Sequence, residues 1–401
     1  MTGGRAPERI VVVGGGLAGH TAVTSLRSEG YTGMLSLLTE EEYLPYDRPP
    51  LSKEVLAGRQ DVAPFLDNYD ELDIEVVLDC KVQKLATETL LTTCGRVPFD
   101  RLIAATGSTP ARLSRSYPAN TFELRTMADA TRLRQALSTG PRVVVVGAGW
   151  LGGEVATVAA AGGCDVTVVD SASTPLARAL PTLIGGLTIP WYGQHGIELR
   201  LNSPIQHLGP TGVKLASGER LPADVTVIAI GARPATGWLE GSGVRLDPYG
   251  AVPVSPLLQT SQPDVFAAGD IISWQSARFG TELRLEHWDN AVSSAAAAAR
   301  NVLGAAESYD PVPYFWSDQL SRRIQYVGSH AKDDRLIFRG DPEEDDSWTV
   351  LWLRDNVIQG AFAVNCPRDI GDARSLIRRQ AHIEAADAAR ASTRLRDAQK
   401  A

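Results

Sequence analysis

Two glycine-rich turns carry the residues of this sequence that are best suited to chemistry. The first spans residues 14–19 and the second spans residues 147–152, so that Gly147 follows Gly14 by 133 positions. Each turn follows a run of valines and precedes a segment with helical spacing. In a dinucleotide-binding fold such glycines allow a tight turn, a close approach of the backbone to a pyrophosphate, and close packing of helix on strand. Two such turns predict two bound nucleotides, and therefore electron or hydride transfer between them.

An acidic residue follows each turn at the distance expected for contact with a ribose. Glu40 follows the predicted strand 34–38 and lies 21 residues after Gly19, and Asp170 lies 18 residues after Gly152. A carboxylate in this place accepts hydrogen bonds from the two ribose hydroxyls. For either residue alone, the alternative is a polar residue that caps a strand end. The presence of both favours nucleotide binding.

The composition predicts an ordinary globular protein. The chain has 401 residues, of which 44% are hydrophobic and 21% charged, and this length suits about two to three domains. The net charge of −8 argues against nucleic acid or an anionic membrane as a partner. No apolar stretch has the length of a membrane span, and no signal peptide precedes the first strand at Ile10. We therefore expect a cytoplasmic protein with neither nucleic acid nor membrane as a partner.

The cysteines and histidines form no redox or metal motif. The four cysteines, which contain neither a CxxC nor a CxxxxC pair, are Cys80, Cys94, Cys164 and Cys366. We expect them to be small buried hydrophobic residues rather than disulfides or metal ligands. The histidines lack metal-ligand spacing, so no metal site is predicted.

Hydrophobic patterning predicts the elements that position the motifs. A strand, a turn and a helix span residues 9–28, and the second turn lies in a repeat of this pattern. A proline-rich loop spans 42–53, with a helix expected to start at Ser52. Further strands are predicted over 74–78, 97–106, 164–169, 225–230 and 260–270, and helices over 129–137 and 293–300. Beyond Pro313 the pattern predicts strands over 314–327, 335–339, 348–354 and 357–363. A helical stretch follows from Gly371, and its last twenty residues could equally be disordered.

Beyond these patterns, the sequence resembles the FAD-dependent NADH:ferredoxin reductases that serve bacterial Rieske dioxygenases and haem-thiolate monooxygenases. The resemblance extends to about residue 380 and is most specific in the loop 45–53, which reads PYDRPPLSK. The other matching segments are residues 105–107, 125–126, 147–154, 266–270, 286–291 and 314–319.

The resemblance implies an α/β fold with two Rossmann-like dinucleotide-binding domains, for FAD and NAD, plus a smaller C-terminal α+β domain. The implied boundaries are 1–113 with 235–306 for the FAD-binding domain, 114–234 for the NAD-binding domain and 307–401 for the C-terminal domain. The implied FAD contacts are Gly14, Gly16, Leu17, Ala18, Gly19, Glu40, Arg48, Lys53, Val82, Ala105, Thr106, Gly107, Arg125, Gly269, Asp270, Trp288 and Ala291. The implied NAD contacts are Gly147, Gly149, Leu151, Gly152, Glu154, Asp170 and Gly231.

Three residues are implied to act at the flavin: Lys53, Glu154 and Trp288. Lys53 and Glu154 would form a partly buried charge pair beside the hydride acceptor, and Trp288 would lie against the nicotinamide. Each residue has a plainer alternative. Glu154 could simply interact favourably with the dipole of its helix near the N-terminus, and Trp288 could be a core aromatic. Likewise, Asp270, which could bind a ribityl hydroxyl, could instead cap a helix. His287 and Ser294 depart from the residues usual in the family, which puts the flavin contacts on their helix in doubt.

The implied function is transfer of hydride from NADH to FAD and of single electrons to a ferredoxin-type iron–sulfur protein, which in turn serves an oxygenase. The alternatives are an NADH oxidase or peroxidase, which would carry a redox cysteine near Tyr43 that this chain lacks, and a redox-responsive binding protein of the apoptosis-factor type. NADH is expected to be preferred over NADPH because Asp170 repels a 2′-phosphate. The candidate basic groups for docking a ferredoxin are Arg322, Arg323, Arg374, Arg378 and Arg379, although a solvated helix surface is an equal alternative for the last three.

Overall fold

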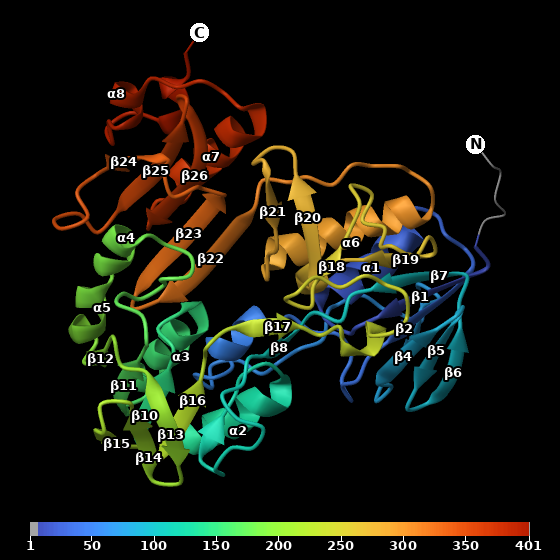
Figure 1. Cartoon of the computed structure of the whole chain (residues 1–401), viewed down its shortest axis with the longest axis horizontal. Coiled ribbons are helices and arrows are strands. Elements are labelled where there is room, and N and C mark those ends of the chain that lie inside the picture. Colours follow the sequence, from blue (N-terminus) through green and yellow to red (C-terminus); the bar gives the residue numbers. More distant parts are fainter. Residues whose placement is uncertain (1–6, 401) are drawn as a thin grey trace. The chain divides into compact units, whose positions relative to one another are not determined.

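The structure is a computed structural model that describes residues 7–400, and these residues form two compact units. The first unit holds the chain up to Asp47, 63–109 and 233–313, and the second holds 48–62, 110–232 and the chain from Tyr314 onward. Figure 1 labels most of the helices and strands of both units. The strands β8 (Ser108–Pro110) and β17 (Ala232–Pro234) lie at two of the places where the chain passes from one unit to the other.

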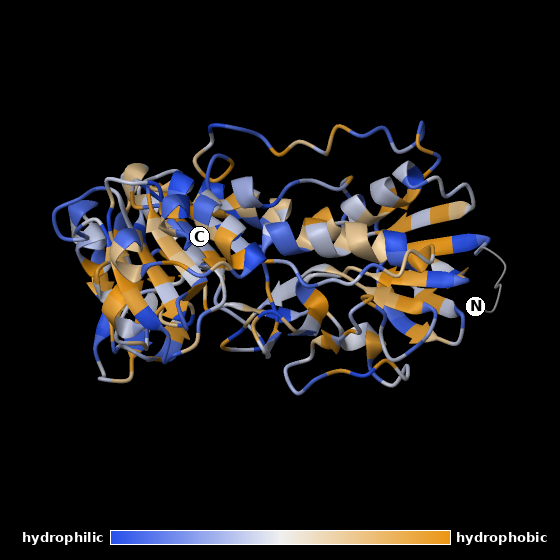
Figure 2. Ribbon diagram, turned by 90° about the horizontal axis from the view of Figure 1, so that it is seen from above, coloured by the Kyte–Doolittle hydropathy of each residue, from blue (hydrophilic) through white to orange (hydrophobic). Residues whose placement is uncertain are grey.

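A parallel five-stranded sheet forms the centre of the first unit, with the order β19-β7-β1-β2-β3. Its strands are β1 (Arg9–Val13), β2 (Met34–Leu38), β3 (Glu75–Val77), β7 (Arg101–Ala104) and β19 (Val265–Ala267). The helices α1 (Leu17–Ser28) and α6 (Trp288–Val302) pack against each other and contact the sheet (Figure 1). Strand β1 is almost entirely aliphatic because a parallel sheet is normally covered on both faces. Figure 2 shows hydrophobic residues along many of the strands.

Smaller sheets complete the first unit. One is an antiparallel sheet of β4 (Val82–Ala86), β5 (Thr89–Thr92) and β6 (Gly95–Pro98). The other is made of β18 (Val252–Pro253), β20 (Ile272–Ser276) and β21 (Thr281–Leu283). Two short 3-10 helices are η2 (Gly237–Leu239) and η3 (Gly269–Ile271). The single strand predicted over 97–106 is wrong, because Phe99 and Asp100 separate β6 from β7 and the two strands belong to different sheets.

The second unit contains a matching parallel sheet, with the order β12-β11-β10-β16-β9. Its strands are β9 (Thr121–Phe122), β10 (Arg142–Val146), β11 (Asp165–Val169), β12 (Glu198–Arg200) and β16 (Val225–Ile228). Its helices are α2 (Met127–Leu137), α3 (Trp150–Ala161), α4 (Thr182–Gly186) and α5 (Ile189–Gln194). An antiparallel sheet of β13 (Ile205–Gly209), β14 (Gly212–Leu215) and β15 (Arg220–Pro222) packs on it. The predicted repeat of the strand–turn–helix–strand unit is confirmed.

Local residues set where two of the helices in this unit begin. Helix α2 starts two residues before the predicted Asp129, because Thr126 and Asp129 form a reciprocal capping box. The helix predicted to start at Ser52 is wrong. Residues Pro49–Ser52 form the 3-10 helix η1, and Lys53 then leaves helical geometry with φ −122° and ψ −100°. The prolines fix one turn, but the chain does not continue it as an α-helix.

The chain from Tyr314 onward forms an antiparallel sheet with the order β22-β23-β26-β25-β24. Its strands are β22 (Tyr314–Gln319), β23 (Arg322–Gly328), β24 (Arg335–Arg339), β25 (Trp348–Arg354) and β26 (Val357–Val364). Helix α7 (Pro367–Arg379) packs on this sheet, and α8 (Ala385–Ala388) and η4 (Leu395–Ala398) follow it. The single strand predicted over 314–327 is wrong, because Leu320 and Ser321 both have positive φ and turn the chain into a hairpin.

Arg339 holds the C-terminal segment in place. Its guanidinium is buried, pairs with Asp369 at 2.9 Å, and donates hydrogen bonds to the backbone oxygens of Ala388, Arg390 and Thr393. Leu395 is fully buried as well. The sequence left the order of the last twenty residues open, and these contacts hold residues 388–393 against β24, with Leu395 buried just beyond them. Within residues 7–400, no helix combines the length and the apolar character needed to cross a bilayer.

Candidate active site

The first glycine-rich turn has the geometry of a nucleotide cradle. Gly14 has a φ of +119°, and a Cβ there would lie 2.2 Å from the Ala105 carbonyl oxygen. A Cβ on Gly19 would lie 1.8 Å from the Gly14 oxygen. Both positions therefore require glycine, the first because the turn meets the end of β7 and the second because α1 starts directly against the turn.

The second turn repeats this geometry in the other unit. Gly147 has a φ of +110°, and a Cβ there would lie 2.3 Å from the Ala229 oxygen, while a Cβ on Gly152 would lie 1.9 Å from the Gly147 oxygen. Around Gly149, the middle glycine, the described residues other than its neighbours in the chain leave the space within 4 Å of an added Cβ open. This combination of tight backbone contacts and open space before the helix N-terminus fits a dinucleotide pyrophosphate.

The two acidic residues that follow the turns have different surroundings. Asp170 accepts hydrogen bonds from the backbone N–H groups of Ala148, at 2.7 Å, and Ala172, at 2.8 Å. It therefore holds the second turn in shape. Glu40 has a side chain that is 61% exposed and forms an ion pair with Lys81 at 3.0 Å. Both carboxylates retain lone pairs for a ribose, and ribose binding by either residue remains a prediction.

Helix α6 holds the Gly269–Asp270 segment. The Gly269 N–H donates to Ser294 Oγ at 2.8 Å, and Asn290 Nδ2 donates to the Gly269 oxygen at 3.1 Å. Asp270 accepts a hydrogen bond from Ser108 Oγ at 2.9 Å, and the residue that caps η3 is Ala268, without a side-chain bond. The alternative of Asp270 as a helix cap is therefore wrong. Ser294, which departs from the usual family residue, anchors this turn.

Trp288 is the first residue of α6 and is 39% exposed, so the alternative of a core aromatic is wrong. Its Nε1–H donates to Asp47 Oδ1 at 3.1 Å. The preceding residue, His287, is a helix N-cap by position. Burial lowers the pKa of His287 to about 4, and the nearby Asp270 carboxylate opposes that shift only in part. His287 is therefore neutral at pH 7.

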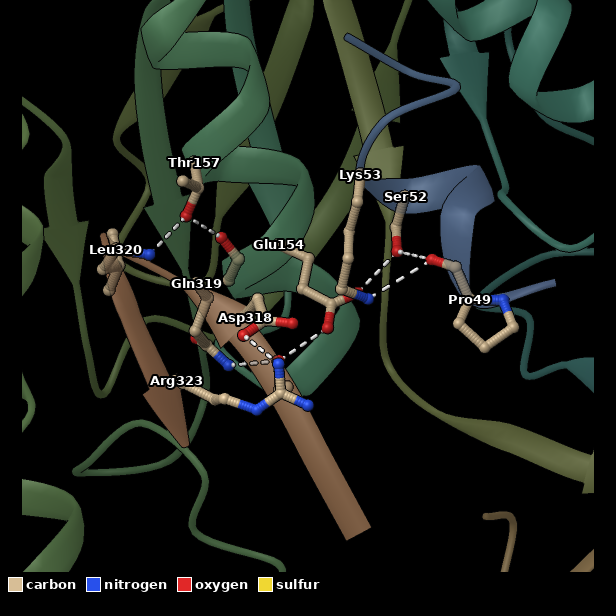
Figure 3. A network of polar contacts seen from close by, with 11 residues as sticks. Pro49, Ser52, Lys53, Glu154, Thr157, Asp318, Gln319, Leu320 and Arg323 are labelled. Carbon is tan, nitrogen blue, oxygen red and sulfur yellow. Dashed lines mark hydrogen bonds and ion pairs between the residues drawn. The ribbon is translucent and has the colours of Figure 1, made fainter. Parts of the chain in front are cut away.

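Lys53 and Glu154 form the most buried charge pair of the candidate site, and the network around them is drawn in Figure 3. Lys53 Nζ lies 2.8 Å from Glu154 Oε2, and the two side chains are only 14% and 8% exposed. Lys53 also donates to the Pro49 oxygen at 3.3 Å. The helix dipole alone does not explain why the Glu154 carboxylate is buried here, because the carboxylate has a specific buried cationic partner.

Two serines complete the hydrogen bonding of the Glu154 carboxylate. Ser52 Oγ donates to Oε2, the oxygen that Lys53 contacts, and Ser317 Oγ donates to Oε1 at 2.6 Å. The carboxylate thus receives three donors, two from the proline-rich loop and one from β22. Such donors compensate part of the cost of burying the charge and fix the orientation of both oxygens.

Strand β22 is fitted closely to helix α3. A Cβ on Gly153 would lie 1.8 Å from Gln319 Oε1, so glycine makes room for this side chain. Gln319 Nε2 donates to Ser317 Oγ at 3.0 Å. The Leu320 N–H donates to Thr157 Oγ1 at 2.8 Å, one helical turn further on (Figure 3). The C-terminal sheet therefore positions the Lys53–Glu154 pair through Ser317.

Comparisons with known proteins identify the family of this chain. Residues 8–295 match the family model described as pyridine nucleotide-disulphide oxidoreductase, and residues 314–399 match the model described as reductase C-terminal. The ferredoxin–NAD(+) reductase component of the p-cumate 2,3-dioxygenase system of Pseudomonas putida is 33% identical over 97% of this chain and 98% of its own. The chain belongs to the pyridine nucleotide-disulphide oxidoreductase family. The resemblance to NADH:ferredoxin reductases is thereby confirmed, as is the α/β fold class.

Two further relatives of this oxidoreductase are informative. The crystal structure of the covalent putidaredoxin reductase–putidaredoxin complex has a TM-score of 0.92 and 27% identity, with 98% of each chain covered. Human apoptosis-inducing factor 3 is 34% identical over 84% of this chain and 57% of its own length. FAD and NADH, the predicted cofactors, are those of this family.

The other predicted site residues of the reductase lie on several different elements. Val82 is buried at the start of β4, and Ala291 lies in α6. Arg48 directly precedes η1, and Arg125 directly precedes Thr126, the N-cap of α2. Gly231 has a φ of +102°, and a Cβ there would lie 2.5 Å from Arg178 Nη1. Leu17 and Leu151 lie in the first turns of α1 and α3, as does Ala18 in α1. Their contacts with nucleotides remain predictions.

Sequence reasoning missed Ser52 and Ser317 as site residues. Both lie inside segments that carry the family resemblance, 45–53 and 314–319, and this position is the sequence feature that could have identified them as site residues. A serine side chain alone does not indicate which carboxylate it will meet. The cysteine prediction was also partly wrong, since Cys94 is exposed while Cys80 is buried.

Proposed function

We propose that this protein is a reductase that takes hydride from NADH onto bound FAD and passes electrons singly to a ferredoxin-type iron–sulfur protein serving an oxygenase. The observation that carries the proposal is the presence of two glycine-rich turns of the same geometry, one in each compact unit. One turn suits FAD and the other suits NADH. The bound flavin would supply the chemistry, because it accepts two electrons together and releases them one at a time.

The residues of the chain would orient the reaction. Asp170 would accept the ribose hydroxyls of NADH while it keeps the second turn in shape. Lys53 and Glu154 would provide a fixed pair of charges, whose positions depend on Ser52 and Ser317. Fixed charges in a water-poor site need no reorganisation as the reaction proceeds, and this lowers its barrier. Trp288 would offer an aromatic face to the nicotinamide from the start of α6.

The electron acceptor in this proposal is a small iron–sulfur protein. The putidaredoxin reductase complex and the dioxygenase-system relative support this class of partner by their names alone. The exposed side chains of Arg378 and Arg379 on α7 supply local positive charge on a chain whose net charge is −8. Arg322 is less suited to docking, because its guanidinium stacks on Trp191 at 4.7 Å. The proposal includes a cytoplasmic location, where NADH is available.

The decisive test combines three measurements on the purified protein. We expect one FAD per chain from the absorption spectrum, rapid bleaching of that spectrum by NADH, and rapid reduction of a bacterial [2Fe–2S] ferredoxin with little peroxide formed in its absence. An NADH oxidase or peroxidase would turn over oxygen or peroxide without the ferredoxin. A redox-responsive binding protein would be reduced but would turn over slowly. A protein that stays colourless after incubation with FAD would overturn the proposal.

A further inference from the structure

Cys80 and Cys94, which are 14 positions apart in the sequence, lie at the two sides of one threonine. Cys80 Sγ contacts Thr92 Oγ1 at 3.4 Å, and the Cys94 N–H donates to the same oxygen at 3.0 Å. Cys94 Sγ lies 3.7 Å from the backbone oxygen of Asp79, the residue before Cys80. One thiol is buried and the other is exposed, and both are free.

The turn between β5 and β6 lies against the segment that precedes β4, and this contact explains why the cysteines meet. Strand β4 begins at Val82, which pairs with Thr92 of β5. The pairing continues outward, because the Thr93 N–H donates to the Lys81 oxygen at 3.0 Å. Cys80 directly precedes Lys81, and Cys94 directly follows Thr93 in the two-residue turn between β5 and β6, where Thr92 pairs with Gly95. Two hydrogen bonds join Lys81 and Thr93, because the Lys81 N–H also donates to Thr93 Oγ1 at 2.9 Å. These bonds hold the adjoining Cys80 and Cys94 next to each other, as a disulfide between them requires.

The segment that carries Cys80 is bound to a predicted FAD contact. The Cys80 N–H donates to the Thr39 oxygen at 2.8 Å, and Lys81 pairs with Glu40 at 3.0 Å. A Cβ on Gly15 of the first turn would lie 2.3 Å from Thr39 Oγ1. Cys80 is therefore linked through Thr39 to the glycine-rich turn. A constraint on Cys80 would restrain the segment that is expected to hold the FAD ribose.

We propose that Cys80 and Cys94 form a reversible disulfide when the protein meets hydrogen peroxide, and that this bond braces the FAD-binding segment. In the first step the Cys94 thiolate attacks peroxide, an S–O bond forms, the O–O bond breaks, and the leaving hydroxide takes a proton to become water. The Cys80 thiolate then attacks the sulfenic sulfur, the S–S bond forms, and the second oxygen leaves as water. Two thiols and one peroxide thus give one disulfide and two waters.

The order of attack follows from exposure. Cys94 is exposed and meets the oxidant first, whereas Cys80 is buried and acts as the resolving thiol. Burial raises the pKa of the Cys80 thiol, contact with Thr92 lowers it, and Cys94 raises it further. The resolving step therefore becomes faster as the pH rises above neutrality. Disulfides in reducing compartments are usually transient and redox-sensing, which suits this chemistry.

Peroxide treatment of the FAD-loaded protein, followed by thiol alkylation under denaturing conditions and peptide mapping, tests the bond. We expect the titratable thiols to fall from four to two, a Cys80–Cys94 linked peptide, and full recovery with dithiothreitol. The Cys94→Ser variant should form no linked peptide. The matched control is a Cys164→Ser/Cys366→Ser double variant, which should still lose two thiols.

Three outcomes would overturn the disulfide. They are sulfinic acid at Cys94 with Cys80 still titratable, a disulfide between two chains, and four unchanged thiols. The brace has its own readout, the rate of FAD release in moderate urea. We expect release to be slower after oxidation of the wild type, and to be unchanged by oxidation of Cys94→Ser. Equal release from oxidised and reduced wild type would overturn the brace. Only the brace rests on the proposed function, because the linked peptide forms whether or not the chain reduces a ferredoxin.

Discussion

Ser317 Oγ donates a 2.6 Å hydrogen bond to Glu154 Oε1, and this contact joins the C-terminal sheet to the buried charge pair. Ser317 lies in β22, and Glu154 lies in the second turn of α3. The contact gives the C-terminal domain a direct part in the site. It also means that the geometry of the Lys53–Glu154 pair depends on a residue 163 positions from Glu154.

Replacing Ser317 with alanine should slow the reduction of FAD by NADH. The variant loses a hydrogen bond to a charged group, worth about 1.5 to 3 kcal/mol, and we expect a rate about tenfold lower with unchanged FAD content. Stopped-flow bleaching of the flavin spectrum measures this rate. Ser375→Ala on the exposed face of α7 is the matched control and should behave as wild type. Equal rates for the two variants would show that Ser317 does not position the pair.

Removing Lys53 alone should destabilise the protein more than removing the pair. Lys53→Met leaves the buried Glu154 without its cation, which lowers the free energy of unfolding by about 3 to 5 kcal/mol. The hydrogen bonds from Ser52 and Ser317 to the carboxylate reduce this loss. The double variant Lys53→Met/Glu154→Leu should recover most of the stability in urea unfolding. Hydride transfer should stay low in both. A double variant that transfers hydride at the wild-type rate would exclude a functional role for the pair.

NADH should be preferred over NADPH by about tenfold to a hundredfold in kcat/KM, because the Asp170 carboxylate repels a 2′-phosphate. Asp170→Asn should reduce this preference by removing the charge. It should also slow the reaction with NADH, because Asp170 accepts hydrogen bonds from both Ala148 and Ala172. Steady-state kinetics with the two nucleotides checks both effects. Equal efficiencies in the wild type would refute the role of Asp170.

His287 should make stability fall as the pH falls below about 6.5. Its pKa is about 4 in the folded protein, below its ordinary value, so the unfolded chain binds more protons in this window. The stability is fully present above pH 6.5 and is lost as the pH falls towards 4. Between pH 7 and pH 5 we expect the free energy of unfolding of the wild type to fall by about 1 to 2 kcal/mol through this residue, and this contribution should be absent in His287→Ser. Chemical unfolding at both pH values measures it, and identical pH dependence in the two proteins would contradict the prediction.

Reversing Arg378 and Arg379 to glutamate should raise the apparent KM for a ferredoxin and leave ferricyanide reduction nearly unchanged. Charge attraction acts on the association rate, so the wild-type rate should also decline as salt is added. The matched control reverses Arg96 and Arg245, two exposed arginines of the first unit, with the same change in net charge. If both double variants behave alike, or if the ferricyanide rate falls as well, this face of α7 does not dock the ferredoxin.

The sequence determined the features that depend on neighbours along the chain. Valine runs, glycine turns and the helical segments after them specify the two dinucleotide units, because each motif is local and its periodicity shows which face is buried. The family resemblance supplied the Lys53–Glu154 pair, which the structure brings together at 2.8 Å. Where local signals were weak, as at Ser52 and over 97–106, the predicted elements were wrong.

Only the tertiary structure decided which distant side chains share a site. Ser52 and Ser317 lie 102 and 163 positions from Glu154, and no periodicity relates them. Their meeting depends on how β22 and the proline-rich loop pack on α3, with Gly153 leaving room for Gln319. Cys80 and Cys94 likewise become neighbours because the turn between β5 and β6 lies against the segment before β4. A sequence pattern reports the environment of one element, whereas a hydrogen bond between elements depends on the packing of the whole unit.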